Sequence, residues 1–113
     1  MKLNSISGVT YQVKDLQASI RFYESLGFRI GKQDEKHALC YVNWFWVDLV
    51  AGAGARDEGT SLYIKVDSID EHYKDVTQQG MKPSAEPEQK ASGNREFLLC
   101  DPDGHRLVFF EKK

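Results

Sequence analysis

Hydrophobic and polar residues alternate along the first stretch of the chain that has a clear pattern, 8-GVTYQV-13. A period of two is typical of a strand with one buried face. Apolar residues then recur at helical spacing from Leu16 to Leu26, with Asp15 as a predicted N-cap and Gly27 as the predicted stop. Three β-rich runs separated by short polar breaks follow, at residues 28–30, 37–42 and 44–50. The first half therefore predicts the order β-α-β-β-β.

The second half repeats this pattern. Residues 61–66 alternate as a strand, Ser68 or Asp67 caps a helix that extends to Gly80, and the stretch 62–80 echoes 9–27. A polar segment with Pro83 and Pro87 then crosses to the final predicted elements, which are a strand at 95–100, a turn at 101–104 and a strand at 106–110. The chain thus predicts a tandem βαβββ repeat.

Two such modules define an α+β fold. We expect their strands to form one cup-shaped, eight-stranded mixed sheet with the two helices on the outer face. A chain of 113 residues lies inside the range of single domains, so residues 1–113 are predicted to form one domain. The modules would span about 1–52 and 60–113, joined by a Gly- and Ala-rich flexible connector at about 51–59.

Composition narrows the classes of partner. Hydrophobic residues make up 41% and charged residues 28% of the chain, which is typical of a globular protein. The net charge of -2 and the scattered Lys and Arg leave no basic stripe, so we expect no nucleic acid partner. No signal peptide or long apolar span is visible, which predicts a cytoplasmic protein without a membrane partner. Cys40 and Cys100 are both expected to be reduced core residues.

Three motifs together resemble the vicinal-oxygen-chelate superfamily, which includes glyoxalase, bleomycin-resistance protein and extradiol dioxygenase. They are 13-VKDLQASIRFYESLGF-28, 62-LYIKVDSIDEHYKDVTQQG-80 and 94-NREFLLCDPDGHRLVFFE-111, and they cover nearly the whole chain in the order of the family. The resemblance implies the paired βαβββ cup. Members include metal-dependent lyases, isomerases and dioxygenases as well as antibiotic-binding proteins without a metal, so the fold alone does not choose a function.

The ligand set implied by the resemblance separates these alternatives. In metal-dependent relatives, His, Glu or Gln side chains occupy four strand positions that point into the cup. These positions fall here on Gly8, Asp48, Ser61 and Val108. Only Asp48 could bind a metal, whereas a catalytic site needs about three protein ligands. We therefore expect no metal and no cofactor. The three histidines show no metal-binding spacing and are interpreted as surface or turn residues: His37, His72 and His105.

Strand alternation then assigns the remaining residues of each face. If the four positions face inward, the predicted ligand-binding face consists of Thr10, Gln12, Trp44, Trp46, Asp48, Ser61, Tyr63, Arg106, Val108 and Phe110, with Lys65 beside them. A four-residue turn at Asp101 to Gly104 would pair Phe97 with Val108 and Arg95 with Phe110, so Arg95 and Phe97 would join this face. A one-residue bulge would reverse that last assignment.

An aromatic wall with charged tips suits a flat or conjugated organic ligand. The leading hypothesis is a metal-independent small-molecule binding protein of the bleomycin-resistance type, which sequesters a compound such as an antibiotic. The second is a lyase, isomerase or dioxygenase with a noncanonical site around Asp48. The third is a stress or regulatory partner that uses the cup as an interface.

The aromatics could equally fill a dimer interface, and the charges, Lys65 and Arg106 in particular, could be solvated. Exposed sheet edges predict a homodimer.

Overall fold

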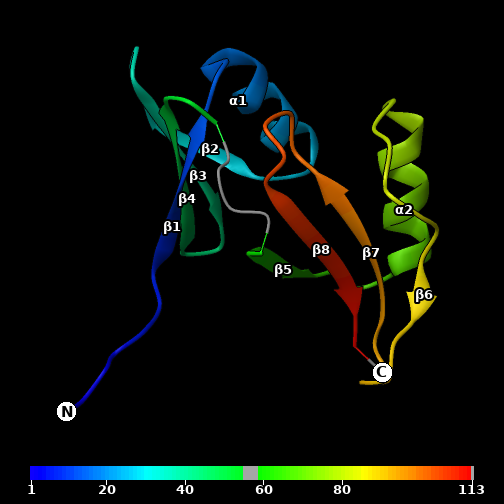
Figure 1. The fold of residues 1–113 in the computed structure, drawn as a ribbon. Coiled ribbons are helices and arrows are strands. Elements are labelled where there is room, and N and C mark those ends of the chain that lie inside the picture. Colours follow the sequence, from blue (N-terminus) through cyan, green and yellow to red (C-terminus); the bar gives the residue numbers. More distant parts are fainter. Residues whose placement is uncertain (55–58, 113) are drawn as a thin grey trace. The chain divides into compact units, whose positions relative to one another are not determined.

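The chain divides into two compact units, Met1–Ala55 and Arg56–Lys113 (Figure 1). A computed structural model describes residues 1–54 and 59–112. The unit boundaries lie close to the predicted modules, and the central part of the predicted connector, residues 55–58, lies outside the described residues. The prediction that residues 1–113 form one domain stays a prediction.

The first unit contains a four-stranded mixed sheet and one helix. The sheet order is β1-β4-β3-β2, in which β1 and β4 run parallel and the other neighbours run antiparallel. Because parallel neighbours need a long crossover, the helix and two strands between β1 and β4 provide that connection. The elements are β1 (Gly8–Val13), α1 (Leu16–Ser25), β2 (Arg29–Gln33), β3 (His37–Val42) and β4 (Phe45–Ala51).

The second unit repeats this topology. Its sheet order is β5-β8-β7-β6, and again the first and last strands of the module run parallel. The elements are β5 (Ser61–Lys65), α2 (Ile69–Gln78), β6 (Glu88–Gln89), β7 (Arg95–Cys100) and β8 (Arg106–Glu111). The predicted α+β fold with tandem βαβββ modules is confirmed. The hydrogen-bonded strands form two sheets of four, and their combination into one cup stays a prediction.

The two helices begin and end with the residues that the sequence predicts. The Asp15 carboxylate accepts a hydrogen bond from the Ala18 amide, and the Ser68 hydroxyl accepts one from the Glu71 amide. Both helices are followed by a glycine in the left-handed region, Gly27 at φ +107° and Gly80 at φ +85°. Residues with a Cβ atom rarely adopt this conformation, so glycine favours the stop.

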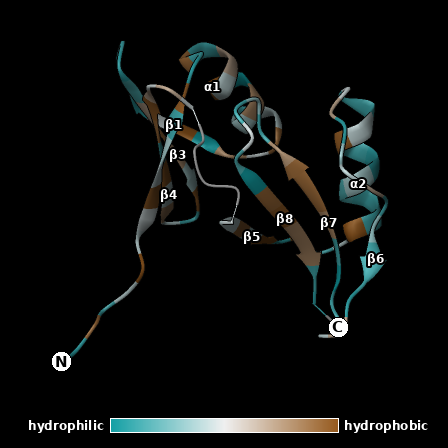
Figure 2. Cartoon of the chain, in the orientation of Figure 1, coloured by the Kyte–Doolittle hydropathy of each residue, from teal (hydrophilic) through white to brown (hydrophobic). Residues whose placement is uncertain are grey.

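The core of each unit lies between its helix and one face of its sheet. Figure 2 shows hydrophobic colouring along β4, β7 and β8 and hydrophilic colouring over β6 and much of α2. Alternation predicts these buried positions, and the strand residues buried to 1% exposure or less include Val13, Val47, Leu49, Leu107 and Phe109. Burial of such side chains contributes about 1.5–3 kcal/mol each. The helix covers one face of each sheet, so the opposite face is the one on which a ligand could bind.

The burial of two residues differs from the prediction: His72 packs against the core, and Cys100 is exposed. His72, predicted to be a surface or turn residue, is partly buried: its ring packs against Phe109 with a centroid distance of 4.3 Å, and burial lowers its pKa. Cys40 is fully buried as predicted, and burial raises the pKa of its thiol to about 11. Cys100, by contrast, is exposed because it ends β7 on the face away from α2.

The structure corrects the position of Trp44. Val42 pairs with Phe45 across the β3–β4 hairpin, so Asn43 and Trp44 form its turn and β4 begins one residue later than predicted. Asn43 has a φ of +55°, a conformation that asparagine tolerates and hairpin turns require. The Trp44 side chain is 81% exposed and lies outside the sheet face.

Candidate functional site

The face of the first sheet opposite α1 carries the predicted residues of β1 and β4. Thr10 and Gln12 are exposed, whereas their neighbours Tyr11 and Val13 are buried. Trp46 and Asp48 alternate in the same way with the buried Val47 and Leu49, and Thr10 pairs directly with Asp48. The predicted parity of these two strands is therefore confirmed.

Gly8 leaves space for the Trp46 indole. The two residues are partners in the parallel β1–β4 pair, and a Cβ atom added to Gly8 would lie 2.1 Å from Cδ2 of Trp46. Such a distance is far below van der Waals contact, so any side chain at position 8 would displace the indole. The Trp46 ring thus covers the surface onto which a residue-8 side chain would project.

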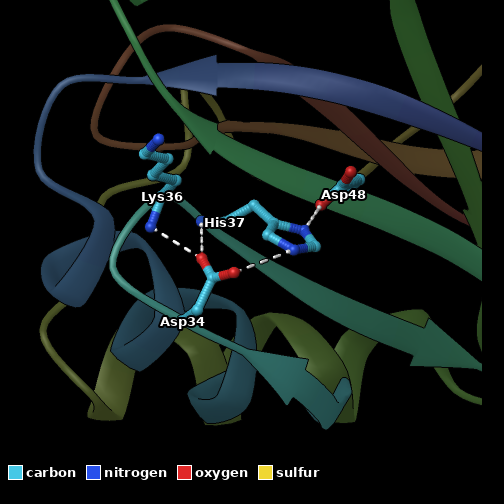
Figure 3. Close-up of polar contacts among 4 residues, drawn as sticks. All are labelled: Asp34, Lys36, His37 and Asp48. Atoms are coloured by element: carbon cyan, nitrogen blue, oxygen red, sulfur yellow. Dashed lines mark hydrogen bonds and ion pairs between the residues drawn. The ribbon is translucent and has the colours of Figure 1, made fainter.

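A polar cluster lies on the same face around His37, the first residue of β3. Figure 3 shows its ring between two carboxylates: Nδ1 is 2.9 Å from Oδ1 of Asp48, and Nε2 is 3.5 Å from Oδ2 of Asp34. The hydrogen bond to Asp48 is the main cause of a raised His37 pKa, and the charge of Asp34 adds to it. Asp34 is itself held by the amides of Lys36 and His37, which lower its pKa. His37, predicted to be a surface or turn residue, has a side chain that is 38% exposed, and its ring connects β4 to the β2–β3 turn.

This cluster predicts a pH dependence of stability. A histidine whose pKa is raised by folding stabilises the protein below its unfolded pKa, about 6.5, and this contribution is lost as the pH rises through the folded pKa. We expect the difference in urea midpoint between the unmodified protein and the His37→Gln variant to be largest near pH ~5.5 and to shrink towards pH ~8.5. When the same His37→Gln change is made in an Asp48→Asn background, the difference in urea midpoint should be smaller. A gap that stays constant with pH would show that His37 acts as a neutral partner.

The corresponding face of the second sheet carries the predicted residues of β5 and β8. Ser61 pairs with Arg106, and the Arg106 Nε donates a hydrogen bond of 3.1 Å to the Ser61 hydroxyl. Tyr63 pairs with Val108, and its ring is 61% exposed and meets Phe110 edge to face at 6.3 Å. These five residues therefore share the open face, as predicted.

The register of β7 corrects the prediction for Arg95 and Phe97. Five residues, 101–105, separate β7 from β8, so Leu98 rather than Phe97 pairs with Val108. Phe97 is 3% exposed and packs against Tyr73 and His72 of α2, and Arg95 forms an ion pair of 2.9 Å with Asp70 of the same helix. The one-residue shift places both side chains on the helix face, and Glu96 and Leu98 take their place on the open face.

A pocket of about 230 Å³ lies on this open face. The Ser84 amide donates to the Leu98 carbonyl, and Glu88 pairs with Glu96, so four steps along the segment that leads into β6 oppose two along β7. The longer segment lines one side of the pocket. Its lining consists of Ser61, Tyr63, Ser84, Ala85, Glu86, Glu88, Lys90, Glu96, Phe97, Leu98, Arg106 and Val108.

Part of this lining was not predicted from the sequence. Ser61, Tyr63, Phe97, Arg106 and Val108 were predicted, whereas the segment from Ser84 to Lys90 was interpreted only as a crossover. No periodicity marks that segment, because only Glu88 and Gln89 form a strand. Pro83 and Pro87 were the available signal, since proline disfavours a regular central strand and is found at edges and bulges.

Comparison with known proteins agrees with this architecture. The sequence profile of the Glyoxalase/Bleomycin resistance protein/Dioxygenase superfamily matches residues 5–109. A putative glyoxalase family protein from Bacillus anthracis superposes with a TM-score of 0.85 at 17% identity, covering 100% of this chain and 98% of the other. A glyoxalase/bleomycin resistance protein/dioxygenase from Alicyclobacillus acidocaldarius gives 0.80 at 18% identity over 96% and 91%. A bleomycin-binding protein complexed with bleomycin gives 0.77 at 22% over 97% and 100%. No curated protein matches the sequence.

The fold and its open faces define the class of protein, a tandem βαβββ protein. The chain belongs to the Glyoxalase/Bleomycin resistance protein/Dioxygenase superfamily. Within residues 1–54 and 59–112, no helix has the length and apolarity needed to span a membrane.

The residues at the metal positions of the family do not fit a metal ion. Gly8 has no donor atom, and its surroundings are filled by Trp46. Asp48 is hydrogen bonded to His37, the Ser61 hydroxyl accepts from Arg106, and Val108 is apolar. In the described parts of the chain, no three His, Cys, Asp or Glu side chains gather into a metal-binding group. A transition-metal site needs about three such ligands.

Proposed function

We propose that this chain is a metal-independent binding protein for a small aromatic or conjugated organic molecule. The observation that carries the proposal is the pocket on the open face of the second sheet. Its floor contains the apolar side chains of Leu98 and Val108, which are cross-strand partners, and the exposed ring of Tyr63 lies next to Val108. An apolar floor with an aromatic edge and a few polar groups is the usual composition of a small-molecule site.

The unsuitable metal positions support the same proposal. Because Gly8, Ser61 and Val108 do not form a ligand set, binding in this pocket would depend on stacking, apolar contact and charge. A bleomycin-binding protein complexed with bleomycin has the same fold, and sequestration of an antibiotic is one form that the proposed function could take. The expected homodimer and cytoplasmic location remain predictions. β1 and β5 are the end strands of their sheets, and such edges favour pairing with another strand.

The test combines ligand screening with one truncation. A library of small aromatic compounds is screened by thermal shift and amide NMR in the presence of a chelator, and we expect hits that perturb the amides of Tyr63, Leu98 and Val108. Tyr63→Ala should weaken these hits about tenfold with little loss of stability, because its ring is exposed. Trp44→Ala is the matched control, since it removes an exposed aromatic of the other unit. The proposal would be overturned if binding of the hits were lost in the presence of the chelator, or if Tyr63→Ala left their affinity unchanged.

One observation favours a second candidate function, an enzyme of the lyase, isomerase or dioxygenase type that uses Asp48. The carboxylate of Asp48 has a histidine partner at 2.9 Å, and such a pair can hold and move a proton. Turnover that survives a chelator and is lost in both His37→Gln and Asp48→Asn would support this candidate over simple binding.

A further inference from the structure

We propose that the pocket of the second sheet selects a small dipolar ligand, with a cationic nitrogen held near Glu96 and an anionic group held by Arg106. This inference rests on the proposed binding function and specifies the chemistry of its ligand. It follows from the arrangement of charges around the pocket.

The acidic end of the pocket carries more negative charge than its own cation balances. Glu88 and Glu96 are direct cross-strand partners, and Glu86 lies in the segment that leads into β6. Like charges directly opposite each other destabilise a strand pair. Lys90 forms an ion pair with Glu88 and also interacts with Glu96, whereas Glu86 interacts with the Arg95 guanidinium. Within the pocket, one positive charge therefore faces the two carboxylates of Glu88 and Glu96. An ammonium or guanidinium group of a ligand would compensate for this imbalance.

The opposite end of the pocket carries a positive charge. Arg106 makes none of the ion pairs among residues 1–54 and 59–112, and its Nε is held by the Ser61 hydroxyl. This hydrogen bond fixes one edge of the guanidinium and leaves its terminal nitrogens available. Arginine binds carboxylate and phosphate groups through two parallel N–H bonds, so an anionic group is the natural partner of this end.

The floor between the two ends is apolar and of defined length. Arg106 pairs with Cys100, Val108 with Leu98 and Phe110 with Glu96. Four residues along the strand therefore separate Arg106 from the level of Glu96, which corresponds to roughly 13 Å between backbones. Both charged side chains are long and can shorten this span. The pocket volume of about 230 Å³ is below the usual range for drug-sized ligands, so a compact molecule is expected.

The experiment uses the full chain and a series of α,ω-amino acids of increasing chain length, with alkylamines and alkanoates of matched length as monofunctional probes. Binding is measured by isothermal titration calorimetry and by amide NMR. We expect the preferred amino acid to bind at least roughly tenfold more tightly than either monofunctional probe. Replacing the carboxylate of the preferred probe by a phosphonate distinguishes a carboxylate from a phosphate as the anionic group.

Two variants should give opposite patterns. Arg106→Gln keeps a donor for Ser61 but removes the charge, and it should weaken the amino acid and the alkanoate about tenfold while leaving the alkylamine unchanged. Glu96→Gln should weaken the amino acid and the alkylamine and leave the alkanoate unchanged. Glu71→Gln, on the exposed surface of α2, removes a carboxylate away from this face and should change none of them. Thermal melts verify that each variant is folded.

The failures of the two proposals are distinguishable. If aromatic library compounds bind at the pocket but charge-removing variants have no selective effect, the dipolar ligand is excluded and the binding function stands. If neither the library nor the charged probes perturb Tyr63, Leu98 or Val108, both proposals are overturned.

Discussion

The Phe97→Ala variant is expected to lose about 3–5 kcal/mol of unfolding free energy and roughly 10–20 °C in Tm. Phe97 is 3% exposed and packs against His72 and Tyr73 of α2 and against Phe109 of β8, at ring-centroid distances of 5.9, 5.4 and 5.4 Å. Truncation removes these contacts and leaves a cavity between helix and sheet. Urea unfolding and thermal melting measure the loss.

The neighbouring residue gives the matched control. Leu98 lies on the opposite face in the pocket and is only partly buried, so Leu98→Ala should cost much less stability and should weaken pocket ligands instead. The pair tests the β7 register directly. If Leu98→Ala unfolded the protein as readily as Phe97→Ala, and only Phe97→Ala weakened ligands, the register and the assignment of the open face would both be wrong.

The second large effect is expected at Asp101, a buried carboxylate in the β7–β8 connection. Its Oδ1 accepts hydrogen bonds of 2.9 Å from the amides of Asp103 and His105. Hydrogen bonds to a charged group contribute about 1.5–3 kcal/mol each, and unpaired buried donors are costly. We expect Asp101→Ala to lose about 2–4 kcal/mol of unfolding free energy, measured by urea unfolding.

Asp101→Asn is the control, because its side-chain oxygen can still accept both bonds and only the charge is lost. It should retain more than half of the stability that Asp101→Ala loses. Hydrogen exchange at the amides of Asp103 and His105 should accelerate strongly in the alanine variant and only slightly in the asparagine variant. Equal losses in both variants would mean that the charge, rather than the acceptor geometry, stabilises the connection.

The sequence by itself predicted the order of the elements other than β6, both helix ends and the faces of most strands. Alternation was decisive in β1, where Thr10 and Gln12 alternate with apolar residues, because one face of the strand must pack against a helix. In β4 the polar Asp48 between Val47 and Leu49 indicated the open face. Asp15 and Ser68 predicted the helix starts through hydrogen bonds within four residues of the chain. Such local interactions need no knowledge of the rest of the fold.

The tertiary structure alone decided the facing of β7. Phe97, Leu98 and Leu99 are consecutive apolar residues, so alternation cannot assign them, and the register depends on the length of the following connection. The predicted turn does form, since the Gly104 amide donates to the Asp101 carbonyl. His105 nevertheless adds a fifth residue before β8, its carbonyl accepting from the Asp101 amide. A one-residue shift exchanges the two faces of a strand, because side chains alternate with a period of two.

The same limit applies to the two polar features of the site. His37 forms a hydrogen bond with Asp48 of a neighbouring strand, and Glu96 lies opposite Glu88 in the β6–β7 pair. These contacts depend on strand order and register, which are set by packing between residues distant in the chain. The sequence therefore predicted the family and part of the pocket lining, whereas the tertiary structure decided which residues share the pocket.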